Sequence, residues 1–207
     1  MKAKDKPLLR EVVIATRNAG KLREIREILA PLGWKILSLK EFPGIPETVE
    51  DRTTFAKNAE KKAREVARQA GRLAIADDSG LAVEALQGRP GVYSSRYAGE
   101  KATDAEEVQK LLAEMAGIPE GKRQAAFVCV LAIAMPQGDM QLLEGECRGV
   151  IAFAPRGRHG FGYDPIFLLP EFGKTMAELA PEVKNRISHR AQALEKLKAI
   201  LPQFLPP

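Results

Sequence analysis

The sequence lacks any apolar run of membrane-spanning length, and Met1 to Arg10 lacks the apolar core of a signal peptide. Cysteine is scarce: Cys129 and Cys147 lie in apolar, strand-like runs without the spacing of metal ligands. We therefore expect a cytoplasmic protein that binds no membrane and whose two thiols are reduced core side chains.

A dense block of lysine and arginine is absent as well. The net charge of +5 comes from 32 basic and 27 acidic residues that are spread along the 207-residue chain. Such a modest excess fits an anionic small ligand at least as well as a nucleic acid. With 45% hydrophobic residues and no internal repeat, the sequence predicts a single α/β domain over 1–207, with loosely packed terminal extensions at 1–9 and 202–207.

Two adjacent acids follow a short apolar run near the middle of the chain. Leu73 to Ala76 predicts a buried strand that ends at Asp77 and Asp78, and Ser79-Gly80 predicts a turn. Desolvation and mutual repulsion oppose the burial of two bare carboxylates, and a hard divalent cation such as Mg²⁺ would resolve that conflict. Taken alone, an acidic turn with an aspartate as helix cap is the more common outcome.

A polar loop joins the first predicted strand to the first predicted helix. The strand is expected at 11–15 and the helix at 21–30, with Thr16 to Lys21 between them. This arrangement directs backbone N–H groups and a helix dipole at an anion, and Lys21 adds a positive charge. The loop is not a Walker A motif. Thr16 and Asn18 fit simple helix caps equally well.

Hydrophobic periodicity predicts the remaining elements. Strands are expected at 34–39, 125–135 and 141–153, and the last two form a hairpin. Helices are expected at 53–70, 103–116 and from 188 onward, with a short one after 175 that Pro181 interrupts. On the residues alone, Lys62 on the second helix and Glu50 before it are expected on the surface, because charged side chains are mostly solvated.

Two further segments carry candidate binding residues. Gly160 and Gly162 surround Phe161 and would let the backbone approach a flat ligand, although an aromatic core turn is the common alternative. His189 and Arg190 occupy the first turn of the last predicted helix and would face whatever lies at its positive end. A solvated helix start accounts for this pair equally well.

These segments form a series of motifs in one order along the chain. The series is Thr16-x-Asn18-x-x-Lys21, Phe55-x-x-Asn58-Ala59-x-x-Lys62-Ala63, Ala76-Asp77-Asp78-Ser79-Gly80-Leu81, Pro90-Gly91-Val92-Tyr93-Ser94-Ser95-Arg96-Tyr97, Phe161-Gly162-Tyr163-Asp164-Pro165, Lys184 and Ser188-His189-Arg190. Together the motifs resemble the inosine triphosphate pyrophosphatase family, also called the Ham1-like or non-standard purine NTP pyrophosphatases. The resemblance spans roughly Val12 to Leu197.

The resemblance implies an elongated α/β fold, in which a long mixed β-sheet is flanked by helices in two lobes with the active-site cleft between them. It implies Mg²⁺-dependent hydrolysis of ITP, dITP and XTP to the monophosphate and pyrophosphate, usually by a homodimer. Asp78 is implied to be the proton acceptor and a metal ligand, with Glu50 as the second metal ligand. The implied substrate contacts are Thr16, Arg17, Asn18, Ala19, Gly20, Lys21, Ser79, Phe161, Gly162, Tyr163, Asp164, Lys184, His189 and Arg190.

Elementary chemistry gives these residues roles in phosphate chemistry. Asp78 held beside Mg²⁺ can orient and deprotonate a water molecule. Asp77 could share the metal or tune Asp78, and the sequence leaves both options open. Lys21 and Lys62 can stabilise phosphate oxygens alongside the metal.

Recognition of the base would fall to the C-terminal motifs. Phe161 is expected to stack on a purine, and Lys184, His189 or Arg190 would donate to the 6-oxo group of hypoxanthine or xanthine. The amino group of adenine would leave those donors unpaired, which disfavours ATP. Rejection of guanine would need a pocket that lacks an acceptor for its 2-amino group.

Two other functions compete with this interpretation. A Maf-like nucleotide pyrophosphatase would share a phosphate loop and an acidic metal site, but it gives no role to the segments at 161–164 and 188–190. A basic nucleic-acid-binding module is suggested by the pI near 9.2, but it gives no role to Asp77 and Asp78.

Overall fold

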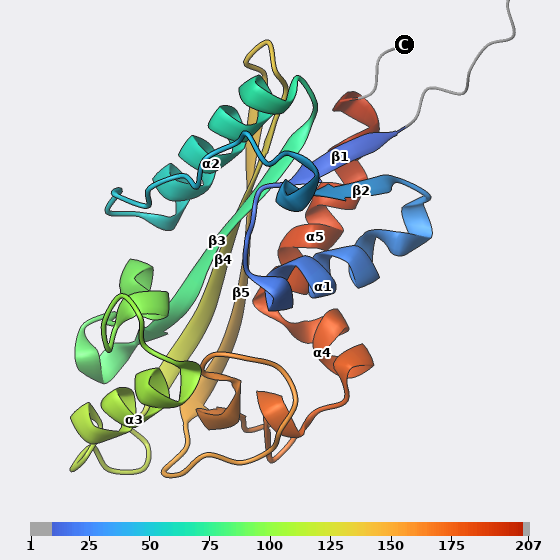
Figure 1. Cartoon of the computed structure of the whole chain (residues 1–207). Coiled ribbons are helices and arrows are strands. Elements are labelled where there is room, and N and C mark those ends of the chain that lie inside the picture. The colour runs from blue at the N-terminus through green and yellow to red at the C-terminus, as the bar shows by residue number, and fades with distance from the viewer. Residues whose placement is uncertain (1–9, 205–207) are drawn as a thin grey trace, which may run out of the picture.

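The computed structural model describes residues 10–204 and consists of one mixed β-sheet with helices on both faces (Figure 1). The seven strands lie in the order β2-β1-β3-β4-β5-β6-β7. Their bounds are β1 Glu11–Ile14, β2 Lys35–Ser38, β3 Ala74–Val83, β4 Gln124–Ala134, β5 Met140–Ile151, β6 Phe167–Leu169 and β7 Lys174–Thr175. The predicted α/β class is confirmed.

Parallel and antiparallel pairing divide the sheet. β1 runs parallel to both β2 and β3, whereas every pair from β3 to β7 is antiparallel. β4 is the central strand and forms the expected hairpin with β5. Its nearly continuous apolar sequence suits a strand that is covered on both faces. The long strands β3, β4 and β5 connect the two ends of the molecule (Figure 1).

Five α-helices accompany this sheet in the described part of the chain. They are α1 Ala19–Leu29, α2 Phe55–Ala70, α3 Asp104–Glu114, α4 Pro181–Ile187 and α5 His189–Ile200. Side-chain caps begin four of them, from Asn18, Thr54, Thr103 and Ser188. The capping box expected from Thr103 and Glu106 is present, because its two hydrogen bonds depend on neighbouring residues alone.

The two faces of β3 pack against different helices. Ile75 belongs to a core cluster with residues of α1 and α5, while Ala74 and Ala76 belong to a cluster with residues of α2. A third cluster, which includes Leu81, joins the far end of β3 to α3. Figure 1 shows α2 on one side of β3 and α1 and α5 on the other. Because successive side chains of a strand point to opposite faces, residues that follow one another on β3 are presented to different helices.

Three predictions about this framework are wrong. The turn expected at Ser79-Gly80 is absent, because β3 continues to Val83 and pairs with β4 along its whole length. Pro181 begins α4 instead of interrupting a helix, which suits a residue with a fixed φ and no N–H. The C-terminal end is not loosely packed as far as it is described, since 201–204 form a 3₁₀ turn that buries Phe204 in the core; 1–9 and 205–207 lie outside the described residues.

Cys129 and Cys147 are free and buried, as expected. None of the helices within 10–204 combines the length and the apolar character that crossing a membrane requires.

Candidate active site

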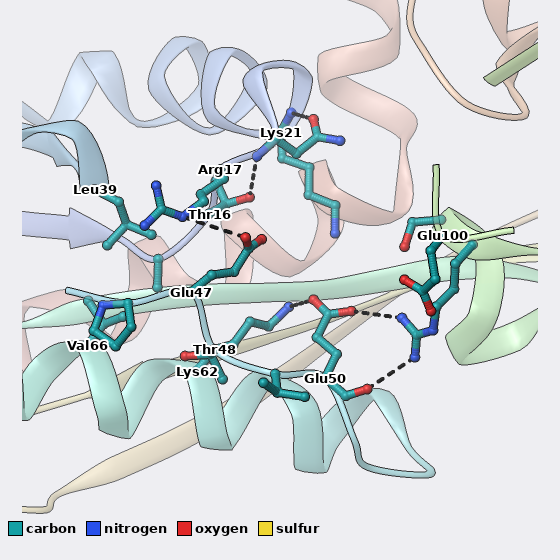
Figure 2. Close-up of a pocket in the computed structure, with 16 residues that line it drawn as sticks. Thr16, Arg17, Lys21, Leu39, Glu47, Thr48, Glu50, Lys62, Val66 and Glu100 are labelled. Carbon is teal, nitrogen blue, oxygen red and sulfur yellow. Dashed lines mark hydrogen bonds and ion pairs between the residues drawn. The ribbon is translucent and has the colours of Figure 1, made fainter. Parts of the chain in front are cut away.

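Two adjoining cavities share part of their walls. The first has a volume of about 560 Å³ and is bounded by the loop before α1, the loop before α2, and α2 itself (Figure 2). The second has a volume of about 240 Å³ and is bounded by β3, by the segment around Phe161 and by the start of α5. Asn18, Lys21, Glu50 and Ser95 line both cavities. A single extended ligand can therefore occupy the two together.

Asp77 is buried in a dense set of partners on the face of β3 that packs against α1 and α5. Its Oδ2 accepts hydrogen bonds from Arg190 Nε at 2.8 Å and from the Cys129 thiol at 3.2 Å. Its Oδ1 pairs with the Lys21 ammonium and accepts from the Ser79 hydroxyl. Burial opposes ionisation, but the charges of Arg190 and Lys21 outweigh it and hold the pKa of Asp77 well below its ordinary value. Asp77 is therefore a fixed anion.

Asp78 points to the opposite face and has far fewer partners. Its Oδ1 lies 3.1 Å from Lys62 Nζ, and its buried Oδ2 has no hydrogen-bond partner among the described residues. Burial raises the pKa of Asp78 above the ordinary value, although Lys62 and Lys21 oppose the shift. A desolvated carboxylate with a free oxygen is more basic than a solvated one. Asp78 thus has the properties that a general base requires.

Lys62 is buried at 8% exposure, so its expected place on the surface is wrong. Its Nζ donates to Glu50 Oε1 at 2.7 Å, to Asp78 Oδ1 at 3.1 Å and to the backbone carbonyl of Asp77 at 2.8 Å. Burial alone would lower the pKa of Lys62, but the charges of Asp78 and Glu50 raise it. Glu50 remains partly exposed, and its side chain lies beside that of Lys62 in the first cavity (Figure 2).

The family resemblance implies a magnesium ion. The protein offers two carboxylates to such an ion, so its other ligands would have to come from water and the substrate. Glu50 and Asp78 converge on the same ammonium group, and Asp78 Oδ2 is a carboxylate oxygen without a partner. Within 10–204, no group of three or more His, Cys, Asp or Glu side chains is arranged to hold a metal. Mg²⁺ typically takes one or two carboxylates together with water and substrate phosphates. The residues therefore fit a metal ion that shares its coordination with a phosphate chain.

The loop before α1 and the first turn of α1 bring cations and a helix N-terminus to the first cavity. Asn18 accepts from Lys21 N at 2.9 Å and caps α1, so the capping role is present. The open end of the helix still faces the cavity that Thr16, Arg17, Asn18 and Lys21 line, which favours an anion. Arg17 is tethered by the carbonyl of Ile45.

Ala19 and Gly20, the first two residues of α1, do not line either cavity. Gly20 instead supports the second cavity from outside. A Cβ atom at Gly20 would lie 2.7 Å from Cδ1 of Phe161, so the aromatic ring rests directly on the glycine. Only a residue without a side chain allows this contact.

Cations approach the Phe161 ring in the second cavity. Lys184 Nζ lies 4.8 Å and Arg190 Cζ 5.7 Å from the ring centroid. Lys184 forms ion pairs with Asp164 and with Glu24 Oε1, the latter at 2.8 Å. Glu24 also pairs with Arg190. The cations are therefore held rigidly beside the ring.

Glu24 is a site residue that the sequence analysis missed. It is buried at 5% exposure on α1 and links two predicted substrate contacts from α4 and α5. The available signal was its position three residues after Lys21, because i and i+3 share a helix face.

His189 and Tyr163 differ in how their polar atoms are used. His189 is buried, stacks on Phe127 with ring centroids 4.8 Å apart, and has an unpartnered Nδ1. Burial and the charge of Arg190 lower the pKa of His189 well below its ordinary value, so the ring is neutral. The Tyr163 hydroxyl is already engaged by the Ser94 carbonyl and by Glu107. Tyr163 therefore shapes the cavity wall through its hydroxyl contacts.

The structure brings together most of the predicted site residues. Those lining at least one cavity are Thr16, Arg17, Asn18, Lys21, Glu50, Asp78, Ser79, Phe161, Gly162, Tyr163, Asp164, Lys184, His189 and Arg190. Residues that are as much as 174 positions apart in the sequence thus surround one connected space.

The sequence and the fold are both similar to those of known proteins. A model of the Ham1 family matches residues 12–200. The chain is 56% identical over 189 residues to a dITP/XTP pyrophosphatase of Geobacillus kaustophilus, covering 91% of this chain and 93% of the relative. It is 48% identical over 194 residues to a dITP/XTP pyrophosphatase of Bacillus subtilis, covering 94% of this chain and 98% of the relative. The solved structure of a HAM1 protein from Coxiella burnetii superposes with a TM-score of 0.85 at 46% identity, covering 93% of this chain and 98% of that one.

Proposed function

Because the chain belongs to the Ham1 family, we propose that it is a dITP/XTP pyrophosphatase that hydrolyses dITP, XTP and ITP to the monophosphate and pyrophosphate. The observation that carries this proposal is the convergence of Asp78 and Glu50 on Lys62 where the two cavities adjoin. A base placed there can activate a water molecule beside the bond between the α- and β-phosphates, so that the nucleoside monophosphate lies on one side and the leaving pyrophosphate on the other.

We assign the triphosphate to the first cavity. Lys21, Lys62 and Arg17 surround it with positive charge, and the N-terminus of α1 adds its dipole. Leaving pyrophosphate gains negative charge during hydrolysis, and fixed cations stabilise that charge without reorganisation. The cleft between two lobes that the family resemblance implies corresponds, in this proposal, to the two cavities together.

Asp78 acts as the base that orients the attacking water and takes its proton. Its raised pKa and its unpartnered Oδ2 support that assignment. Glu50 and Asp78 would hold Mg²⁺, which, when bound, supplies a Lewis acid that neutralises phosphate charge. Lys62 keeps the two carboxylates close together before substrate arrives. Asp77 is already paired with Arg190 and Lys21, so we assign it to the support of these cations and not to the metal.

The purine base is assigned to the second cavity, stacked on Phe161. Each of the three guanidinium nitrogens of Arg190 already binds an internal acceptor, namely Asp77, Glu24 or Ser79. Five N–H groups serve these three acceptors, so two remain, and we propose Lys184, His189 and Arg190 as the candidate donors to the 6-oxo group. A 6-amino group would leave these donors unpaired, so adenine is rejected.

The decisive experiment measures pyrophosphate release from dITP, XTP, ITP, ATP, GTP and a modified pyrimidine nucleoside triphosphate, each with Mg²⁺ and with a chelator. We expect turnover of the first three substrates, at least about 100-fold less turnover of ATP, and loss of all activity on chelation. Turnover of modified pyrimidine nucleotides instead would favour the Maf-like alternative. Salt-sensitive binding of oligonucleotides without any hydrolysis would favour the nucleic-acid-binding alternative.

The oligomeric state and the place of action complete the proposal. The resemblance implies a homodimer, which light scattering of the purified protein would test. We expect the enzyme to remove its substrates from the cytoplasmic nucleotide pool.

A further inference from the structure

Glu50 is a proposed metal ligand on a segment that provides little regular support. Residues 42–54, all of them described, contain no helix or strand, and 46–52 form no turn or bend either. The Glu50 side chain is 29% exposed, whereas that of Asp78 is 6% exposed on a central strand. A metal ligand must be held close to its working geometry. Side-chain contacts therefore have to position Glu50.

Arg96 supplies such contacts from a distant part of the chain. Its Nη2 donates to the backbone carbonyl of Glu50 at 3.1 Å, and its Nη1 lies 3.5 Å from Glu50 Oε2. One planar guanidinium thus grips both the main chain and the carboxylate of the same residue. Arg96 is itself steadied by Tyr93, whose ring centroid lies 5.2 Å from Cζ.

Lys62 and Arg96 contact different oxygens of the Glu50 carboxylate, Oε1 and Oε2 respectively. Lys62 binds Oε1 and also contacts Asp78, so it belongs to the reacting centre. In the described part of the chain, both hydrogen bonds of the Arg96 side chain go to Glu50. Arg96 therefore holds Oε2 of the carboxylate, while Oε1 binds Lys62.

We propose that Arg96 is a positioning residue for the reaction, which holds Glu50 in the orientation that binds the divalent cation. The 3₁₀ segment Gly91–Arg96 also provides Ser94 and Ser95 to the wall of the second cavity, to which we assign the purine base. Arg96 consequently couples that wall to the loop that carries the metal ligand. The inference rests on the proposed function, because it takes Glu50 as a ligand of the metal.

Two substitutions separate positioning from simple charge. Arg96→Lys keeps the positive charge but loses the fork that reaches two acceptors of Glu50. Arg96→Gln removes the charge and keeps one donor. If Arg96 acts by position, Arg96→Lys raises the Mg²⁺ concentration for half-maximal dITP hydrolysis by about tenfold, and kcat at saturating Mg²⁺ falls much less. If Arg96 acts only as a charge, Arg96→Lys changes nothing and Arg96→Gln tightens the binding of the cation.

A direct binding measurement makes the result independent of turnover. Electron paramagnetic resonance of free Mn²⁺ reports how much of the ion binds to each protein. We expect weaker Mn²⁺ binding by Arg96→Lys than by the parent protein. The matched control is Arg89→Lys, because Arg89 contacts Tyr97 and Glu114 from the same stretch of chain. Arg89 lines neither cavity, so its variant should bind Mn²⁺ normally.

A double-mutant cycle with Glu50→Gln completes the test. When Arg96 acts through Glu50, the Arg96→Lys change has no additional effect on Mn²⁺ binding in the Glu50→Gln background. Equal losses in both backgrounds would overturn the proposal, as would a rise in the KM for dITP with unchanged Mn²⁺ binding, which would make Arg96 a phosphate contact. A parent protein that releases no pyrophosphate from dITP would refute the proposed function. The Mn²⁺ double-mutant cycle instead tests whether Arg96 affects metal binding through Glu50, and it does not depend on turnover.

Discussion

Asp77 and Asp78 are neighbours on one strand, yet their surroundings are opposite. Asp77 accepts from two cations, a hydroxyl and a thiol, and its pKa is held well below the ordinary value despite burial. Asp78 shares one lysine with Glu50, keeps an oxygen without a partner, and has a pKa that burial raises. The pleat of β3 produces the contrast, because it directs the two carboxylates to different helices.

The contrast separates support from chemistry. A carboxylate whose lone pairs are all engaged stabilises its neighbours but has nothing to offer a water molecule. A carboxylate that is desolvated and incompletely paired is held in a state of higher free energy, which a substrate complex can relieve. Perturbed acids of this second kind are typical of catalytic positions.

The largest expected effect is on turnover, through Asp78→Asn. We expect kcat for dITP to fall by about 10²- to 10⁴-fold, the usual contribution of a general base. Thermal stability should stay the same or rise, because the variant removes a buried and incompletely paired charge. Pyrophosphate release and a melting curve measure the two quantities. Near-normal turnover would remove the assignment of the base.

Asp77→Asn should produce the reverse pattern. Arg190 and Lys21 would lose their shared anion, and breaking a buried pair typically costs about 3–5 kcal/mol of folding free energy. Urea unfolding of the two variants side by side is the appropriate measurement. If the free energy of unfolding is unaffected by Asp77→Asn, the distinction between the two acids is wrong.

Asp77 pairs with Arg190, which lies beside the Phe161 ring. Phe161→Ala tests whether that ring binds the base of the substrate. Loss of a stacking platform commonly costs about 1–3 kcal/mol per base, so the KM for dITP should rise by about 5- to 150-fold. The kcat value should change less, because the ring contacts Gly20, Lys184 and Arg190 and supports neither Asp78 nor Lys62. An unchanged KM would show that the base does not stack on this ring.

The smallest expected effect is the pH dependence of stability. Asp77 has a lowered pKa in the fold, so its stabilising effect is present above about pH 4, the ordinary aspartate value, and is lost as the pH falls through the folded value. Asp78 has a raised pKa, so its penalty exists at neutral pH and disappears as the pH falls through the raised value. Melting temperatures of both Asn variants, relative to the parent protein, should therefore approach the parent value on acidification from opposite directions. Parallel shifts for the two variants would contradict this expectation.

Local signals allowed much of the framework to be predicted. The caps at Thr103 and Ser188 involve residues within three positions of each other, and the β4–β5 hairpin joins adjacent segments. The prediction of a turn at Ser79-Gly80 was wrong. A polar residue followed by a glycine suggests the end of a strand, but pairing with β4 continues the strand through both residues. That pairing joins residues that are about 50 positions apart, and no local pattern encodes it.

The sequence also did not predict which charged side chains are buried. Lys62 looked like an ordinary surface lysine on an amphipathic helix, because its partners Glu50 and Asp78 lie on other elements. Glu24 was missed because its cations come from α4 and α5, about 160 residues later. The motifs identified which residues matter, but only folding determines which of them neutralise one another.

The contact between Gly20 and the Phe161 ring has a consequence for redesign. The platform proposed for the purine sits on the turn proposed for the phosphates, so neither can be altered as an independent module. A larger aromatic at 161, introduced to change nucleobase preference, would press directly on Gly20 at the start of α1. Any library aimed at new substrates should therefore vary 20 and 161 as a pair.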